Sequence, residues 1–375
     1  MTSEVNEEFM PIFSQKPALM TMLTSIVILA GLFVSGCDES VNSDSPEYRA
    51  TNQKTIISEI AGPIMGTSYH IKVVLPSNQQ SLDNLSEGVS ETLKRIDHLM
   101  STYKPNSEIS RFNRLPPNKW FEVSKETYEV ISLGQLISKN SKGFYDMTVG
   151  PLVNSWGFGP SGKPVKIPDG DQLQTLLDRV GFAHLKLDEN TSSIMKDADV
   201  YLDLSSIAKG YAVDAVASYL QENGVQGYLV EVGGEIRAQG EKPNGKVWRL
   251  AIESPTVGQR SVHKVIDLTN AGLATSGDYR NYYEEEGVRY SHTINPFTGK
   301  PVQHKLTSVS VIRPSSAEAD AMATMFMVMG AERGYKFAVE HSIAAYFIYR
   351  SVNNSIGDSE FKSKSTKEFD IYLTQ

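Results

Sequence analysis

Apolar residues recur at helical spacing along several stretches of the chain, and each such stretch predicts a helix. In residues 82–100 the apolar face consists of Leu82, Leu85, Val89, Leu93, Ile96 and Leu99. A second helix is expected from the cap residue Ser124 to about Asn140, with Gly143 closing it. Further helices are expected at residues 169–180, 317–330 and 332–341, and another between residue 205 and Gly224.

Runs rich in β-branched and aromatic residues predict strands between these helices. Residues 55–75 indicate two strands broken at Gly62-Pro63, residues 107–114 a loop or short turn, and Gly233-Gly234 a turn between strands. The remaining strands are expected at residues 184–188, 200–204, 226–232, 247–253, 263–268, 289–295, 343–349 and 369–373. Helices mixed with runs of several strands indicate an α+β fold rather than a regularly alternating parallel sheet.

The composition is that of an ordinary globular protein, and it disfavours several classes of function. The chain has 375 residues, of which 40% are apolar and 21% charged, and its net charge is −8. Because no basic run stands out, nucleic acid is not expected as the main partner. Cys37 is the only cysteine, which excludes an internal disulfide and a cysteine-cluster zinc site. The motifs of Walker-type nucleotide enzymes, dinucleotide-binding folds and zincins are missing from the sequence.

The N-terminal segment predicts a lipid anchor. Residues 18–36 are apolar or small and carry no charge, and Cys37 follows them directly. This arrangement resembles a bacterial lipobox, in which residues 1–36 are removed as a signal peptide and the cysteine is lipidated. A transmembrane anchor is the alternative, because the run is nearly long enough to span a bilayer.

Two features refine this view of the N-terminus. The region before the apolar run is acidic rather than basic, and a start at Met10 instead of Met1 would remove its three glutamates. Asp38, next to the lipidated cysteine, favours retention at the inner membrane, with the protein on the periplasmic side. Residues 37–54 are polar and indicate a flexible tether, and residues 55–375 form the expected folded domain.

Residues 203–214, DLSSIAKGYAVD, predict a strand end, a turn of small residues and a helix start. Ser205 and Ser206 are natural helix starters, and the small side chains would let a ligand approach the backbone. The free N–H groups of a helix N-terminus favour an anion, and Lys209 adds a positive charge. An ordinary strand-turn-helix with a solvated lysine is the alternative.

Three further groups of residues are candidates for chemistry. Asp320 and Thr324 lie four apart on one helix face and offer oxygen ligands that suit Mg²⁺, unless they are a surface Asp and a core-facing Thr. His292 is a candidate proton acceptor, and the nearby Asp278 either orients a histidine or caps a turn. Tyr103 and Tyr145 either lie against a planar ring or pack in the core, as most tyrosines do.

Seven segments, taken together and in order, resemble the ApbE family, the FAD:protein FMN transferases. The likeness extends over most of residues 60–345. The segments are MGTSY (65–69), SEISRFN (107–113), FYDMTVGPLVNSWGFGP (144–160), DLSSIAKGYAVD (203–214), VEVGGEIRAQG (230–240), ATSGDYRNYYEEEGVRYSHTINPFTGKPV (274–302) and ADAMATMFMVMG (319–330).

The resemblance implies a fold and a set of site residues. The fold would be α+β, with duplicated β-α-β units and FAD in the cleft between them. FAD would contact Met65, Tyr103, Phe144, Tyr145, Asp146, Asp203, Lys209 and Ile294. Mg²⁺ would be held by Ser206, through its backbone oxygen, and by Asp320 and Thr324, while His292 matches the catalytic histidine.

The resemblance also implies a reaction. A Thr or Ser hydroxyl of an acceptor protein attacks the phosphorus on the FMN side of FAD, and AMP leaves. Mg²⁺ and Lys209 would stabilise the growing charge, and His292 would take the hydroxyl proton. The implied acceptors are subunits of membrane redox complexes such as the sodium-pumping NADH:quinone reductase.

Two alternatives to this reaction stay open at the level of sequence. The same site would act as an FAD pyrophosphatase if water replaced the acceptor hydroxyl, giving FMN and AMP. A lipoprotein that binds flavin without turnover is the second alternative, although the presence of His292 and the metal positions favours an enzyme. The sequence does not identify the acceptor, the oligomeric state or the extent of FAD hydrolysis.

Overall fold

The computed structural model describes residues 54–77, 82–160, 162–164, 167–256, 261–279, 281–285, 287–351 and 361–374. Contacts divide the chain into two units, Met1–Lys54 and Thr55–Gln375, and all described helices and strands belong to the second. The predicted signal peptide, Cys37 and the tether up to residue 53 lie outside the described residues. Within the described ranges, no helix is long and apolar enough to cross a membrane.

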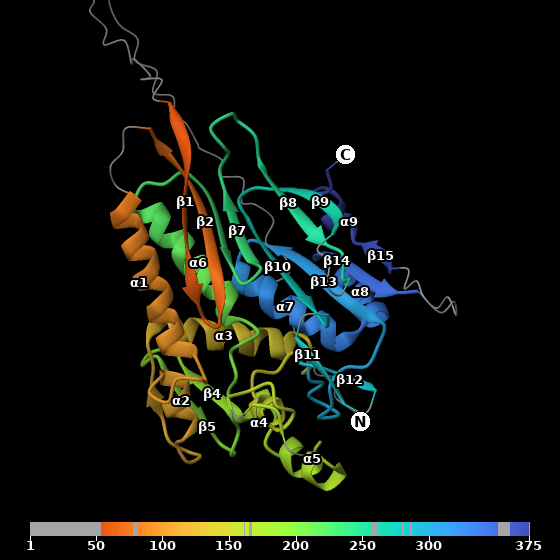
Figure 1. The fold of residues 1–375 in the computed structure, drawn as a ribbon. Coiled ribbons are helices and arrows are strands. Elements are labelled where there is room, and N and C mark those ends of the chain that lie inside the picture. The colour runs from red at the N-terminus through yellow and green to blue at the C-terminus, as the bar shows by residue number, and fades with distance from the viewer. Residues whose placement is uncertain are drawn as a thin grey trace, which may run out of the picture. The chain divides into compact units, whose positions relative to one another are not determined.

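An eight-stranded sheet, antiparallel at every neighbouring pair, forms the centre of the domain (Figure 1). In spatial order its strands are β1 (Thr55–Ile64), β2 (Thr67–Pro76), β6 (Gly227–Val232), β7 (Glu235–Gln239), β10 (Ala271–Gly277), β13 (Leu306–Arg313), β14 (Ala344–Arg350) and β15 (Phe361–Ser365). In the first half of the sheet, β1 and β2 are followed by helices and then by β6 and β7. In the second half, β10 and β13 are followed by helices and then by β14 and β15. The α+β class is therefore confirmed, and the strands of each strand-helix-strand unit pair antiparallel.

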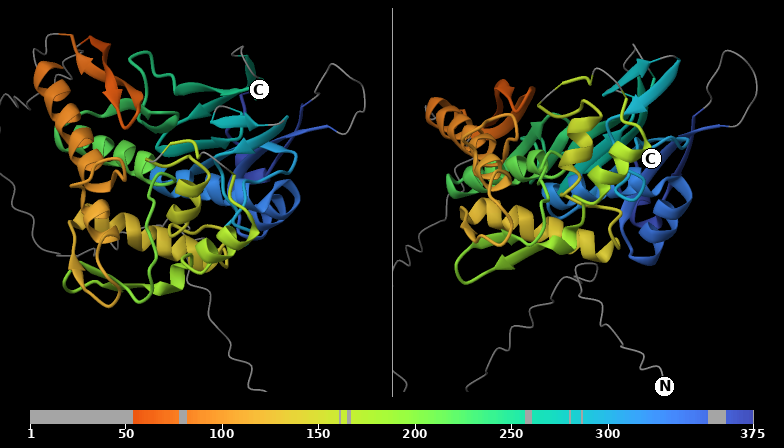
Figure 2. Two further views of the ribbon diagram at one scale, coloured as in Figure 1. Left: turned by 60° about the horizontal axis from the view of Figure 1, so that its bottom comes forward. Right: turned by 90° about the horizontal axis from the view of Figure 1, so that it is seen from below.

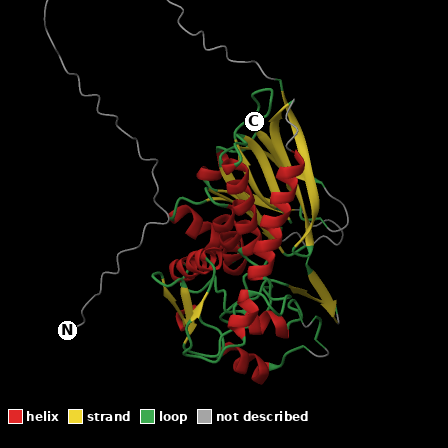
Figure 3. Cartoon of the chain, turned by 90° about the vertical axis from the view of Figure 1, so that its left-hand side faces the viewer, coloured by secondary structure: helices red, strands yellow, loops and turns green. Residues whose placement is uncertain are grey.

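Helices cover one face of this sheet, as the side view in Figure 3 shows. α6 (Ala208–Glu222) packs on β6 and β7, α7 (Ser316–Met329) packs on β10 and β13, and the two helices pack on each other. α1 (Leu82–Met100) packs against α6 and buries Leu85, Val89, Leu93 and Ile96, which confirms the predicted apolar face. α7 is buried on nearly all sides, because it lies between the sheet and α3 (Lys125–Asn140).

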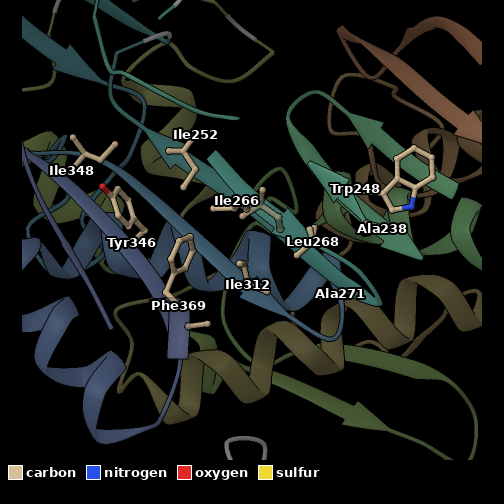
Figure 4. Close-up of a cluster of buried hydrophobic side chains, with 12 residues drawn as sticks. Ala238, Trp248, Ile252, Ile266, Leu268, Ala271, Ile312, Tyr346, Ile348 and Phe369 are labelled. Carbon is tan, nitrogen blue, oxygen red and sulfur yellow. The ribbon is translucent and has the colours of Figure 1, made fainter. Parts of the chain in front are cut away.

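The opposite face of the sheet carries a second core (Figure 4). The two-stranded sheet of β8 (Trp248–Glu253) and β9 (Val262–Leu268) contributes Trp248, Ile252, Ile266 and Leu268. The main sheet contributes Ala238, Ala271, Ile312, Tyr346 and Ile348, and the short helix α9 (Lys367–Asp370) adds Phe369. Both faces of the sheet are thus packed against other elements, which holds its strands in place.

Smaller elements gather at one end of the sheet (Figures 1 and 2). They are α2 (Glu108–Asn113), α4 (Gly150–Ser155), α5 (Gly170–Leu177), the 3-10 turn Phe182–His184, the three-stranded sheet β3 (Phe121–Glu122), β5 (Ser193–Lys196) and β4 (Leu185–Asp188), and the hairpin β11 (Tyr282–Glu285) and β12 (Val288–Ser291). α8 (Ala331–Glu340) follows α7 and packs on it and on β14.

The first hairpin turns at Met65-Gly66, so the predicted break at Gly62-Pro63 is wrong. Met65 and Gly66 have φ values of 48° and 72°, as the tight two-residue hairpin turn requires. Gly62 stays in β1 opposite Tyr69, where a Cβ would come within 2.8 Å of the tyrosine hydroxyl. Pro63 is tolerated because β1 is an edge strand.

Two expectations around residue 203 are also wrong: the strand at 200–204 and the helix start at Ser205-Ser206. Within residues 200–204 only Tyr201 forms a bridge, to Val149, because both backbone groups of Leu202 bond the side chain of Asn113 instead. α6 begins at Ala208, after a turn that includes Ser205 and Ser206, and it has no side-chain cap.

Two short segments differ as well, and several strands were not expected. Residues 107–114 form a capped helix, α2, rather than a loop. In place of the strand predicted at 369–373, α9 ends at Asp370 and only Leu373 forms a bridge, to Ile266. The strands that the sequence did not predict are β3, β5, β7, β10, β11, β13 and β15.

Candidate active site

A cleft of about 860 Å³ collects most of the predicted site residues. It is lined by the segment before α4, the loop into α6, the β6–β7 turn, β10, the segment after β12 and one face of α7. Ten of the predicted residues line it: Phe144, Tyr145, Asp146, Asp203, Ser206, Lys209, His292, Ile294, Asp320 and Thr324. Residues that are more than 100 positions apart in sequence therefore meet in one place.

Two predicted FAD contacts do not line this cleft. Met65 is the first residue of the β1–β2 turn, and its neighbour Gly66 lines the cleft instead. Tyr103 is 65% exposed, and its hydroxyl donates to the backbone oxygen of Phe158 at 3.1 Å. Tyr103 is thus available to an external ring, but the structure ties its hydroxyl to the segment that follows α4.

The loop into α6 is held at its start by side-chain hydrogen bonds. Asn113, at the end of α2, donates to the oxygen of Leu202 at 2.9 Å and accepts from its N–H at 2.8 Å. One residue later, Asp203 accepts from the N–H of Ser205 at 2.8 Å, and its own N–H donates to Met147. No sequence pattern singles out Asn113, because its partner lies 89 positions away.

α6 and α7 meet at Gly210, which brings the loop against Asp320. The N–H of Gly210 donates to Asp320 Oδ2 at 3.1 Å. A Cβ at Gly210 would collide with the oxygen of Ser316 and lie 2.7 Å from the Cα of Ala317. Only glycine permits this close approach of the two helices, and the approach places Asp320 beside Lys209.

Lys209 lies between two buried carboxylates. Its Nζ is 3.1 Å from Glu235 Oε1 and 3.7 Å from Asp320 Oδ2. Burial lowers the pKa of Lys209, but the two carboxylates outweigh this effect and hold it above its ordinary value. Burial also raises the pKa of Glu235 and of Asp320, and Lys209 only partly offsets this. The lysine therefore stays charged, and two acids share one cation.

Aromatic and acidic residues before α4 form the floor of the cleft. Tyr145 is buried, and its hydroxyl accepts a hydrogen bond from Ser206 Oγ at 3.0 Å. Burial strongly raises the pKa of Tyr145, so its phenol stays protonated. Both oxygens of Asp146 accept hydrogen bonds, from Thr148 and from the N–H of Phe182. Asp146 therefore stabilises its own turn in addition to lining the cleft.

The donor set near Asp320 fits a hard cation. Asp320 offers a carboxylate and Thr324 a hydroxyl one turn later, while Ser206 lines the same cleft. Thr324 Oγ1 lies 3.3 Å from Ser276 Oγ, which adds a further oxygen nearby. Within the described ranges there is no group of three or more His, Cys, Asp or Glu that could hold a metal. The side-chain oxygens of this site come instead from one carboxylate and from hydroxyls, which is chemistry that suits Mg²⁺.

His292 has a defined tautomer. Its Nδ1 lies 2.9 Å from the backbone oxygen of Asn281, and since a carbonyl only accepts, Nδ1 carries the proton. Nε2 is then the basic atom, and the ring lines the cleft in a T-shaped contact with Phe158. Burial lowers the pKa of His292; the hydrogen bond to Asn281 offsets part of this effect, and the charge of Lys209 adds a smaller lowering. The neutral base form is therefore favoured.

Asp278 does not orient His292. The histidine is oriented by Asn281, while Asp278 Oδ2 lies 3.8 Å from Arg350 Nη1. Asp278 is buried and does not belong to the residues that line the cleft. It therefore stabilises the region behind the site.

Known proteins resemble this chain over most of its length. The sequence profile of the ApbE family matches residues 65–347. The chain belongs to the ApbE family. A family member from Vibrio cholerae named FAD:protein FMN transferase is 43% identical over 311 residues, which cover 83% of this chain and 92% of the relative. One of the same name from Escherichia coli is 36% identical over 350 residues, covering 92% and 96%.

Solved ApbE structures share the fold. The flavin transferase ApbE from Vibrio cholerae is 40% identical, with a TM-score of 0.77, and the match covers 85% of this chain and 100% of that one. The apo form of Pseudomonas stutzeri flavinyl transferase ApbE is 38% identical with a TM-score of 0.77, covering 85% and 97%. These matches confirm the family expected from the seven sequence segments.

Proposed function

We propose that this chain transfers FMN from FAD to a Thr or Ser hydroxyl of an acceptor protein and releases AMP. The acceptor oxygen forms a bond to the phosphorus on the FMN side, and the bond from that phosphorus to the bridging oxygen breaks. The electron pair of the broken bond leaves with AMP, and the proton of the hydroxyl moves to His292 Nε2. The relatives' shared name supports this reaction class.

The observation that carries the proposal is that one cleft holds both a neutral histidine base and a lysine ammonium group. His292 has its basic Nε2 free of the Asn281 bond, and Lys209 presents an ammonium group on the same cleft. A general base accepts the hydroxyl proton as the oxygen attacks, and a fixed positive charge stabilises the phosphate oxygens. Phe144, which is half-buried on the cleft, offers aromatic surface for the flavin ring, whereas Tyr145 is buried beside it.

We further propose that Mg²⁺ binds at Asp320, Thr324 and the backbone oxygen of Ser206. When bound, the ion offsets negative charge on the pyrophosphate. Asp203 and Ile294 would bind FAD within the cleft that both line, and Met65 and Tyr103 would bind it from outside the cleft. The proximity of Asp320 and Thr324 on α7 and their place in the cleft support this assignment.

The experiment that tests the function uses the purified domain, FAD, Mg²⁺ and a candidate acceptor subunit of a membrane redox complex. Transfer predicts flavin fluorescence that stays with the acceptor band after denaturing electrophoresis, together with one AMP per flavin bound. FMN and AMP in solution without a labelled acceptor would identify a pyrophosphatase. FAD recovered unchanged would identify a flavin-binding protein without turnover.

We also propose that the protein is anchored at the inner membrane on its periplasmic side through lipidated Cys37. The lipobox-like run and Asp38 support this location. A tether of about 17 residues would span roughly 20–25 Å on average, by the usual scaling of flexible chains. That reach would let the domain act on an acceptor held in the same membrane, such as a subunit of the sodium-pumping NADH:quinone reductase.

A further inference from the structure

Glu235 is a buried carboxylate on the cleft wall that the proposed reaction does not use. It is the first residue of β7, and only 4% of it is exposed. Its Oε1 lies 3.1 Å from Lys209 Nζ, whereas its Oε2 is buried without a hydrogen-bond partner among the described residues. Burying a carboxylate is costly unless the group is paired. Its pairing with Lys209 is therefore the contact that accounts for Glu235.

The turn before Glu235 also shapes the path of the lysine side chain. Gly233 and Gly234 have φ values of 62° and 105°, which bring the chain sharply back into β7. A Cβ on Gly233 would lie 3.3 Å from Lys209 Cδ and 2.9 Å from Thr67 Cγ2. The same short turn thus leaves room for the aliphatic part of Lys209 and supplies the negative charge at its end.

Asp320, the second anionic partner of Lys209, has competing interactions. It lies farther from the ammonium group, at 3.7 Å, and it accepts the N–H of Gly210 at 3.1 Å. A divalent cation bound to Asp320 would offset its charge and repel the ammonium group. Glu235 would then be the carboxylate that still holds Lys209.

We propose that Glu235 is a positioning residue that holds the Lys209 ammonium group on the cleft wall, so that the lysine stays directed at the pyrophosphate while a cation occupies Asp320. This inference rests on the proposed function, because it assigns the pyrophosphate of FAD as the target of Lys209. Glu235 acts through Lys209 and makes no contact with FAD. Without its charge, Lys209 pairs with Asp320 alone and competes with the cation.

The test is a double-mutant cycle with Glu235→Gln, Lys209→Met and the double variant. Lys209→Met is expected to slow single-turnover transfer by about 10²–10³-fold, as for the loss of one preorganised donor. Glu235→Gln is expected to slow it by roughly tenfold and to raise the Mg²⁺ concentration needed for half-maximal rate. In the Lys209→Met background, Glu235→Gln should change the rate by less than about twofold, since residues that act as a unit are not additive.

FAD affinity gives a readout that needs neither Mg²⁺ nor acceptor. Quenching of flavin fluorescence should show weaker binding in Lys209→Met, by about tenfold or more, as expected for a lost charge-assisted bond. Glu235→Gln should weaken FAD binding in the wild-type background and leave it unchanged in the Lys209→Met background. A role of Glu235 in overall folding would instead weaken binding equally in both backgrounds.

Three outcomes would overturn the inference. In the first, the losses of rate caused by the two single substitutions multiply in the double variant. In the second, Glu235→Gln transfers FMN and binds FAD like the wild type. In the third, the exposed control Glu222→Gln loses as much rate and affinity as Glu235→Gln. Glu235→Asp keeps the charge on a shorter side chain and should recover part of the loss, and it replaces Glu235→Gln if that variant fails to fold. If the wild-type chain labels no acceptor, the proposed function fails, while the FAD-binding cycle still tests the link between Glu235 and Lys209.

Discussion

Gly210 on α6 donates its backbone N–H to the Asp320 carboxylate on α7, and this bond joins the two central helices at the reaction site. One turn later on α6, Asp214 bonds the start of α7: it accepts from the N–H groups of Ser316 and Ala317 at 3.0 and 2.9 Å. The packing of α6 on α7 therefore also determines where Asp320 lies in the cleft.

Replacing Gly210 tests this link. A Cβ there would meet the backbone of Ser316 and Ala317, which no rotamer change can relieve, so Gly210→Ala should force α6 and α7 apart. We expect a loss of about 1–3 kcal/mol in the free energy of unfolding, as for an overpacked core, with weaker FAD binding. Urea unfolding and a flavin titration measure both.

Gly170→Ala is the matched control, because a Cβ at Gly170 in the first turn of α5 meets no atom within 4 Å. If Gly210→Ala proved as stable as Gly170→Ala, the close approach of the helices would not matter to the fold.

The Asp214 cap makes a separate prediction about stability. Asp214 also accepts from Ser315 Oγ at 2.8 Å and from Arg237 at 3.0 Å, so its two oxygens receive four donors. Asp214→Asn replaces one of these oxygens by an NH₂ group that faces donors. We expect a loss of about 1.5–3 kcal/mol in the free energy of unfolding, the range for hydrogen bonds to charged groups. Thermal unfolding should show a lower melting temperature for Asp214→Asn than for the exposed control Asp171→Asn. Equal melting temperatures of the two variants would contradict the stabilising role of Asp214 at the start of α7.

The sequence predicted those elements whose pattern is local. The amphipathic helix of 82–100 and the helix capped by Ser124 are confirmed, because spacing and capping act within one segment. β13 was missed although Ser308, Val309, Ser310 and Val311 alternate in sequence, and its burial on both faces could not be read from that alternation. Residues 200–204 contain good strand formers, yet the Asn113 side chain takes the bonds that a neighbouring strand would have made.

The same distinction applies to the site. Residues placed by motif, such as His292 and Lys209, do line the cleft. Glu235 and Asn281 were not found, although both lie in or beside quoted segments. Glu235 matters through a lysine 26 positions away, and Asn281 contributes only a backbone oxygen, which no sequence pattern reveals.

The metal assignment predicts different effects for similar substitutions on α7. Asp320→Asn keeps the shape but removes the charge, and it should abolish Mg²⁺-dependent transfer while FAD binding persists through the remaining contacts. Thr324→Val removes the hydroxyl and should raise the Mg²⁺ requirement, whereas Thr324→Ser should not. The measurement is the transfer rate against Mg²⁺ concentration, with a chelator as the zero point. Wild-type transfer by Asp320→Asn in chelator would contradict the assignment.

The proposed anchor predicts where the protein is found. Cys37→Ser removes the only thiol that could be lipidated, so the protein should be released from the membrane or keep its uncleaved signal. Fractionation of cells with an antibody to the domain, together with its apparent mass, distinguishes these results. A wild-type protein in the outer membrane would contradict the role given to Asp38.

The general base gives the sharpest prediction for the reaction. His292→Ala should slow single-turnover transfer to a purified acceptor by about 10²–10⁴-fold, the usual contribution of a general base. FAD binding should survive, because the imidazole is one of many groups in the cleft. The flavin titration of the same variant is the control. A variant that transfers FMN at the wild-type rate would show that the proton goes elsewhere.

The pH dependence tests the same atom without a substitution. Only neutral His292 can accept the proton, so the rate should fall as the pH drops through its pKa. Burial lowers that pKa most, the hydrogen bond to the Asn281 carbonyl offsets part of this, and the Lys209 charge adds a smaller lowering, so the fall should begin below the usual histidine range. Lys209→Met removes the neighbouring charge and should move the acid limb toward higher pH. If the limb stays where it was, the lysine and the base do not interact across the cleft as the structure indicates.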